Sequence, residues 1–342
     1  MGSGSPLPFL FSEIPRRSMK QLLVLFLSLC LAGGGKADER LRTYYGMKLA
    51  VAGIPVFVPQ DPLVRFGQVE AAPKGTWRFN VMPVFGYDSN LNGGVPHDVV
   101  DINGLRFTVL EKDRAIGGLE AGVMARVRAE YYLAQGHRLS GALSARYTRA
   151  LAHDLASQVA TANACYHYDA PSWTFAQACV TAGLSKTELS KTQTETARIS
   201  IGRVFDVGKF PKSFQLGLSK TNGNDADYTQ VHANYNVNTA RATYAIGLMT
   251  RIEGEGHSED KSAYMQITNS MIGRPVSTVF RYSTSSGGGF LGLQRDERTA
   301  SVTISVPLTD RLAFDLSYSD TRSPLQYFRK KTFGANFILT KF

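Results

Sequence analysis

Every second residue from Leu119 to Leu133 is apolar, and the positions between carry the charged residues Glu120, Arg126, Arg128 and Glu130. Because successive side chains of a β-strand point to opposite faces, this stretch predicts a strand with one hydrocarbon face and one charged face. A length of about fifteen residues is unusual for a strand of a soluble protein. Strands that separate lipid from a polar lumen in a closed barrel have both properties.

The same alternation recurs from Thr76 to the end of the chain, with turn residues between the repeats. Six short turns are predicted at 135–137, 169–172, 206–212, 238–240, 272–274 and 309–311. Seven longer loops are predicted at 88–105, 151–157, 186–193, 222–227, 252–261, 283–295 and 319–327. These connections join 14 antiparallel strands with both ends of the barrel on the turn side. About 12 to 16 strands stay possible, because 104–110 fits either an extra strand or a loop excursion.

A soluble β-sandwich would also produce alternating strands. It does not explain the many arginines on the polar faces, the lack of strands that are apolar on both sides, or the terminal Phe342. We therefore predict an all-β protein, a transmembrane antiparallel β-barrel in the outer membrane of a Gram-negative bacterium. Its expected partners are outer-membrane lipids, lipopolysaccharide and, through the C-terminal strand, the barrel assembly machinery. Phe342 is out of phase with Phe337, which makes this terminal signal imperfect.

Residues 1–37 are predicted to be a signal peptide with an N-terminal extension, removed from the mature protein. Met19 and Lys20 precede an apolar run at 21–32, and the small residues of 33–37 suit signal peptidase. The run is too short for a membrane-spanning helix. A twin-arginine signal at Arg16 and Arg17 is the alternative. Residues 38–75, which do not alternate, are predicted to be a periplasmic arm or partial plug, and 76–342 the barrel.

Two cysteines stay in the mature chain, Cys165 and Cys179. An even number of cysteines in an exported protein favours a disulfide. In a hairpin centred near Ser172 these two residues lie directly opposite each other, at a separation that a disulfide can bridge.

The polar faces of the predicted strands place a set of mostly basic side chains in the lumen. They are Arg78, Glu120, Arg126, Arg128, Glu130, Arg138, Arg146, Arg198, His232, Arg241, Arg281 and Asp315. Fixed positive charge in a pore favours anions. The alternative is that Arg126, Arg128, Glu120 and Glu130 pair with their neighbours and brace a water-filled interior. Aromatic residues near the strand ends, which predict interfacial girdles, are Trp77, Tyr87, Tyr147, Tyr166 and Tyr168.

The sequence carries no recognisable catalytic arrangement. None of its histidines stands beside a serine and an acid in a triad pattern, and it has no HExxH motif, phosphate loop or metal-ligand spacing. We therefore predict no catalytic residue, no metal, no cofactor and no nucleic-acid partner.

Two stretches resemble the surface lipoprotein assembly modifier family. Residues 77–92 begin with Trp77 and end in an Asp-Ser-Asn-x-Asn loop entry made by Asp88, Ser89, Asn90 and Asn92. Residues 318–342 are similar to the last hairpin of that family, with an Arg-Ser pair at Arg322 and Ser323 and a terminal Phe342. The family adds an N-terminal domain of tetratricopeptide-like helices, for which 38–75 is too short.

The resemblance implies an outer-membrane conduit that moves a protein or lipoprotein client to the cell surface. The basic lumen points instead to a general or anion-preferring porin for small solutes. A structural barrel that anchors partner proteins is the third expectation.

Overall fold

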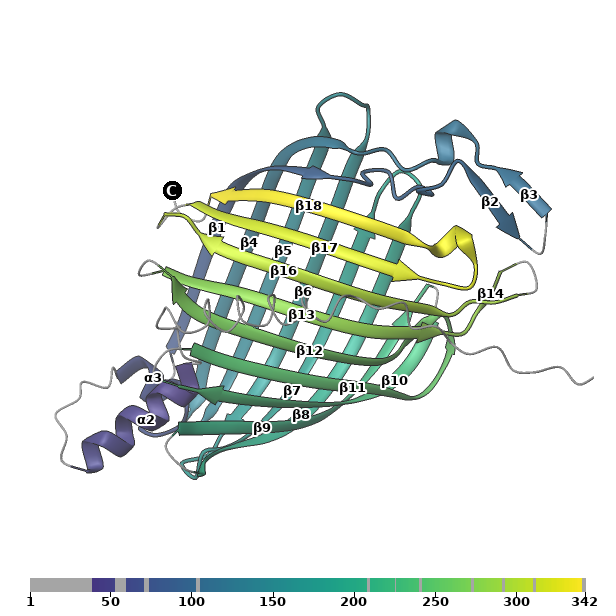
Figure 1. Cartoon of the computed structure of the whole chain (residues 1–342). Helices are drawn as coiled ribbons and strands as arrows, with labels where there is room; N and C mark the ends of the chain where they lie inside the picture. Colours follow the sequence, from purple (N-terminus) through teal and green to yellow (C-terminus); the bar gives the residue numbers. More distant parts are fainter. Residues whose placement is uncertain are drawn as a thin grey trace, which may run out of the picture.

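Fourteen long strands pair antiparallel and close into a barrel in the part of the chain that the structure describes (Figure 1). The computed structural model describes residues 39–52, 60–70, 74–102, 105–207, 210–224, 226–239, 242–271, 274–290, 293–309 and 312–339. The predicted signal peptide at 1–37 lies outside the described residues. The predicted transmembrane antiparallel barrel of 14 strands is confirmed.

Each barrel strand pairs with its neighbour along the chain, and β1 pairs with β18 to close the barrel. The barrel strands are β1 (Lys74–Asp88), β4 (Gly118–Ala134), β5 (His137–Ala150), β6 (Ala156–Asp169), β7 (Thr174–Lys186), β8 (Lys191–Val207), β9 (Phe210–Gly223), β10 (Ala226–Asn238), β11 (Ala242–Gly256), β12 (Ser258–Met271), β13 (Arg274–Ser286), β16 (Glu297–Pro307), β17 (Leu312–Arg322) and β18 (Lys330–Leu339). The other elements are α2 (Glu39–Val51), α3 (Gln60–Arg65), β2 (Val99–Ile102), β3 (Leu105–Thr108), η1 (Glu111–Asp113), β14 (Gly289–Phe290), β15 (Leu293–Gln294) and η2 (Gln326–Phe328).

The two ends of the barrel differ in their connections. At the turn end, where β1 begins and β18 ends, short hairpin turns join the strands. At the loop end, the first connection runs from 89 to 117 and carries the β2–β3 hairpin. The loop extends beyond the predicted end at 105. Of the two alternatives for this region, the loop excursion is the correct one, because Leu105–Thr108 pairs with Val99–Ile102 and not with the barrel. Since outer-membrane barrels have short turns in the periplasm, the turn end is periplasmic.

The outer surface of the barrel is apolar. On β1, Trp77, Phe79 and Phe85 are exposed by 75%, 55% and 46%, whereas their lumen-facing neighbours Met82 and Val84 are buried. A soluble protein buries most of its large apolar side chains, so a belt of this kind requires lipid around it. The protein is therefore an outer-membrane protein of a Gram-negative bacterium. Among the described helices, none has the length and apolar character needed to cross a membrane.

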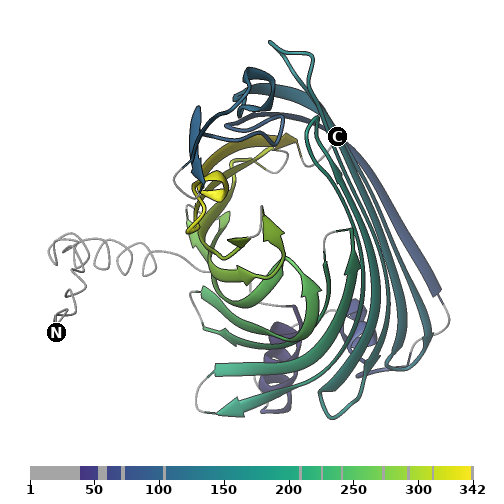
Figure 2. The ribbon, with the colours of Figure 1, turned by 90° about the vertical axis from the view of Figure 1, so that its right-hand side faces the viewer.

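The segment before the barrel is helical in its described parts. Helices α2 and α3 lie at the turn end (Figure 1). Figure 2 looks into the barrel from the loop end and shows both helices at the far end. We call residues 39–70 the N-terminal arm, of which 53–59 lie outside the described residues.

A hairpin from the first loop packs against the last loop. Val95 and Val100 are buried there, with Tyr327 of η2 against them. The ring nitrogen Nε2 of His97 lies 2.9 Å from the carbonyl oxygen of Arg329, and the amide of Asp101 donates to Gln326 Oε1 at 3.1 Å. These contacts join the loops on either side of the β1–β18 seam.

The predicted disulfide between Cys165 and Cys179 is present. The two residues are directly opposite each other on β6 and β7, with their Cα atoms 4.1 Å apart. Their register places the disulfide on the lumen face, in line with Ser140 and Arg198 of the neighbouring strands.

Replacing both cysteines with serine should lower the free energy of unfolding by about 3 kcal/mol, the value for freeing a loop of this length in the unfolded chain. Guanidinium unfolding of the protein in liposomes measures the change. Adding a reductant should destabilise the wild type to a similar degree and leave the double variant unaffected. Equal stability of the two proteins under oxidising conditions would contradict the prediction.

Candidate functional site

Three arginines lie side by side on the lumen wall formed by β1 and β4. Arg78 is directly opposite Arg128, and Asn80 is directly opposite Arg126. Because strand side chains alternate between faces, all of them point away from the exposed outer residue Phe79 and into the lumen. The structure places these arginines on the face that the sequence pattern predicted. We call Arg78, Arg126 and Arg128 the arginine cluster.

The arginine cluster has no acidic partner among the described residues. Within the described part of the chain, no carboxylate oxygen lies within 4.0 Å of the side-chain nitrogens of Arg78, Arg126 or Arg128. Like charges directly opposite each other destabilise a sheet. A cluster of three cations on adjacent strands therefore leaves positive potential in the lumen, and an anion beside the cluster would reduce the repulsion.

Other predicted lumen charges are paired and brace the wall. Arg146 forms an ion pair with the buried Glu120, and it also donates to Asn336 Oδ1 at 3.3 Å. This contact links β5 and β4 to β18, across the closing seam. On the other side of the barrel, Arg281 donates to both carboxylate oxygens of Glu259 at 2.7 and 2.6 Å. The bracing alternative therefore holds for Glu120, whereas Arg126 and Arg128, which it also named, have no acidic partner among the described residues.

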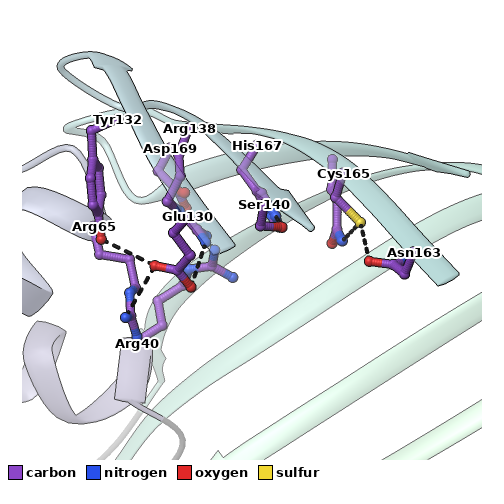
Figure 3. A network of polar contacts seen from close by, with 11 residues as sticks. Arg40, Arg65, Glu130, Tyr132, Arg138, Ser140, Asn163, Cys165, His167 and Asp169 are labelled. Atoms are coloured by element: carbon purple, nitrogen blue, oxygen red, sulfur yellow. Dashed lines mark hydrogen bonds and ion pairs between the residues drawn. The ribbon is translucent and has the colours of Figure 1, made fainter. Parts of the chain in front are cut away.

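A polar network joins the barrel wall to the N-terminal arm near the turn end (Figure 3). Glu130 is its centre: Arg138 of β5 lies 3.3 Å from one carboxylate oxygen, and Arg65 of the arm lies 3.2 Å from the other. The hydroxyl of Tyr132 donates to the same carboxylate at 3.3 Å. Glu130 therefore pairs with a neighbouring strand, as the bracing alternative predicted, and Glu130 also holds the arm through Arg65.

A second part of the same network surrounds Arg40 of α2. Its guanidinium group lies 2.6 Å from Asp169 and 3.8 Å from the centre of the Phe175 ring. Nearby, Ser140 and His167 are hydrogen-bonded at 2.8 Å across β5 and β6 (Figure 3). A partly buried cation such as Arg40 is stabilised by a carboxylate on one side and an aromatic face on the other.

Apolar contacts and a further ion pair complete the docking of the arm. Leu41 is fully buried and packs against the lumen-facing residues Phe175 and Val204. Lys48 pairs with Asp206, also a lumen-facing position on β8. Burial raises the pKa of Tyr44, a residue of α2, against a smaller lowering by Arg203. The first turns of α2 therefore occupy part of the periplasmic mouth.

Two bulky lumen side chains lie flat against the wall. A Cβ atom at Gly217 would lie 2.2 Å from Nε2 of His232, and one at Gly247 would lie 1.9 Å from the ring of Tyr264. Only glycine leaves this space on the neighbouring strand. The Tyr264 hydroxyl donates to Asn234 Oδ1 at 2.9 Å. The wall thereby keeps these rings out of the centre of the lumen.

Two of the remaining predicted lumen residues lie on the lumen face, and one lies outside the described residues. Arg198 is opposite Ser219, and Asp315 is opposite Asn336 and Ser305, on lumen positions. Arg241 and Phe342 lie outside the described residues.

Several charged residues of the lumen were not predicted from the sequence. Arg251 pairs with Asp260 near the loop end, and Asp169 and Asp206 hold the arm. Arg251 could have been found by extending the alternation of β11. Asp260 could not, because the pairing of β12 with β13 shifts register there.

The residues that carried the family resemblance build the loops beside the seam. Asp88 Oδ1 accepts from the Asn90 amide at 2.8 Å, and Ser89 Oγ accepts from the Phe333 amide at 3.0 Å. The buried Asn92 donates to the Arg114 carbonyl at 2.6 Å. In the last loop, Ser323 Oγ donates to the Asp296 carbonyl at 2.7 Å, and Arg322 lies 3.4 Å from Asp320. Loop geometry therefore accounts for these residue types.

The described residues contain no group of three or more His, Cys, Asp or Glu placed to hold a metal ion. The charge of the lumen is unevenly distributed. The β1–β4 wall carries unpaired cations, and much of the opposite wall carries neutral Ser, Thr and Asn side chains. This arrangement attracts and orients charged solutes.

No protein-family model and no curated protein sequence matches the chain. Several solved outer-membrane barrels are similar to it in structure, all with TM-scores below 0.5. OprB of Pseudomonas putida has a TM-score of 0.45 and 11% identity, covering 77% of this chain and 94% of that one. OpdK of Pseudomonas aeruginosa has a TM-score of 0.41 and 10% identity, with 78% and 98% covered. A BenF-like porin from Pseudomonas fluorescens has a TM-score of 0.39 and 9% identity, and the match covers 78% of this chain and 98% of that one. Similarity at this level gives no information about which solute this chain would transport.

Replacing Leu41 with aspartate should release the arm, because the substitution removes the contact with Phe175 and Val204 and would bury a charge. We expect faster amide hydrogen exchange in 39–51 and a larger single-channel conductance. Tyr45→Ser is the matched control, since Tyr45 is an exposed residue of the same helix. Unchanged exchange in the Leu41→Asp variant would show that the arm is held by other contacts.

Proposed function

We propose that this protein is an outer-membrane channel for the diffusion of small anionic solutes. The observation that carries the proposal is the arginine cluster, three lumen-facing cations on adjacent strands with no carboxylate oxygen within 4.0 Å of their side-chain nitrogens in the described residues. Arg138, Arg146, Arg251 and Arg281 illustrate the contrast, because each of these lumen arginines has an acidic partner. Arg198 of β8 is a single lumen arginine without a carboxylate within 4.0 Å in the described residues, away from the cluster.

Unpaired like charges are costly to keep on neighbouring strands, so the arginine cluster does not serve stability. Its potential extends into a narrow water-filled space whose walls have a low dielectric constant, and such walls concentrate the field. An anion is attracted, and it meets guanidinium groups that can donate two parallel hydrogen bonds to a carboxylate or phosphate.

The docked arm favours small solutes over a polypeptide. Arg40, Leu41, Lys48 and Arg65 all hold the arm against lumen-facing residues of the wall. A small ion can pass beside such an arm, whereas a protein or lipoprotein client would have to displace it. The conduit function that the family resemblance implies is therefore the less favoured proposal.

Replacing Arg78, Arg126 and Arg128 together with glutamine should lower the ratio of anion to cation permeability about tenfold, because the main unpaired lumen charge is lost. The reversal potential of the protein in a planar bilayer under a salt gradient measures this ratio. Lys220→Gln is the control, since Lys220 is an exposed cation at an outward position of β9. A wild type without open-channel current would favour the conduit or the anchor instead.

The anion preference of the wild type should fall as the salt concentration rises. The Debye length shortens from about 10 Å at 0.1 M to about 3 Å at 1 M, so mobile ions screen the arginine cluster from the lumen centre. Reversal potentials at a constant salt gradient and increasing mean concentration test this. A preference that does not change with concentration would indicate contact selectivity at a dehydrated site.

A further inference from the structure

A row of polar and basic side chains faces outward at the loop end of four adjacent strands. Lys261 of β12 is opposite Thr284 of β13, Thr284 is opposite Arg298 of β16, and Arg298 is opposite Arg322 of β17. Lys331 of β18 extends the row, because it lies opposite Asp320, two residues before Arg322. We call Lys261, Thr284, Arg298, Arg322 and Lys331 the rim patch.

The phase of the alternation shows that the rim patch faces outward. Each residue of the rim patch is one position away from a lumen-facing residue of its own strand. These lumen-facing residues are Ser262, Ser283, Thr299, Thr321 and Thr332. The four cations of the rim patch are exposed, and the Arg322 side chain is 82% accessible.

The level of the rim patch relative to the membrane follows from the aromatic residues below it. Tyr282 lies two residues from Thr284 on β13, and Tyr318 lies four residues from Arg322 on β17. Both rings are exposed at outward positions, as is Phe333 on the next strand. Such rings mark the boundary between hydrocarbon and headgroups. The rim patch therefore lies at the level of the outer-leaflet headgroups.

The rim patch carries an excess of positive charge on its outward face. Within the described residues of these strands, the four cations share one outward-facing acid, Asp320, which lies 3.4 Å from Arg322. Arg298 and Lys261 have no ion pair within 4.0 Å in the described chain. A cavity of about 1150 Å³ opens at the same rim. Its lining combines the basic residues Arg298, Arg322, Arg329, Lys330 and Lys331 with the acidic residues Asp260, Asp296, Glu297 and Asp320.

We propose that the rim patch binds lipopolysaccharide through the phosphate groups of its lipid A. Phosphate oxygens accept charge-assisted hydrogen bonds from guanidinium groups, and two arginines directly opposite each other can bind one phosphate between them. The acyl chains of the same molecule lie along the apolar face below, beside Tyr282 and Tyr318. The function of the lumen plays no part in this binding.

Native mass spectrometry of the detergent-purified full chain tests the proposal, with bisphosphorylated lipid A and its dephosphorylated form as probes. The wild type should bind the bisphosphorylated form at least about tenfold more tightly, and Arg298→Gln with Arg322→Gln should lose that difference. Lys186→Gln with Lys191→Gln is the matched control. These lysines are also opposite each other and exposed at the loop end, on β7 and β8 at the far side of the barrel.

A shift of the band on heating in gel electrophoresis checks that each variant is folded. Equal affinity for the two forms of lipid A, or equal losses in the two double variants, would overturn the proposal. Displacement of lipid A by inorganic phosphate at equal concentration would also overturn it, because the rim patch would then recognise the free ion. Retained anion preference in the Arg298 and Arg322 variant is expected, since neither residue faces the lumen.

Discussion

Backbone hydrogen bonding inside lipid is the constraint on which the rest of this structure depends. No water is available there to satisfy an unpaired amide or carbonyl, so a sheet that crosses the bilayer must close on itself. The pairing of β1 with β18 achieves this closure. Once the sheet is closed, each strand has one face toward lipid and one toward the lumen. Because side chains alternate along a strand, successive residues face lipid and the lumen in turn.

Arginine has two roles in the lumen, and the presence of a nearby acid separates them. Arg138 is a structural residue because Glu130 lies beside it and the arm lies beyond. Arg78 and Arg128 have the same side chain on the same wall, but they face each other. A count of basic residues cannot distinguish these cases, whereas the pattern of partners can. On the outside of the barrel the same criterion distinguishes Arg298 and Lys261, which have no ion pair in the described chain, from Arg322, which has Asp320.

The alternation of apolar and polar residues predicted the barrel, the number of strands and the face on which Arg126 lies, because a period of two is independent of how strands pair. The hairpin spacing likewise predicted the disulfide between Cys165 and Cys179. Partners were not predictable in this way. Arg40 and Asp169 are 129 positions apart in sequence, and no local pattern connects them. Strand-like residues at 105–108 form a loop hairpin, since local preference does not specify which sheet a strand joins.

The contact between the first and last loops also orders the events of folding. His97 and Arg329 are separated by 232 positions, and β1 and β18 are the first and last strands of the barrel. Contacts between residues so distant in sequence form late, because the chain between them must first be ordered. The β2–β3 hairpin can meet η2 only when the two terminal strands are already neighbours. Its docked position is therefore a marker of a completed barrel, visible from the cell surface.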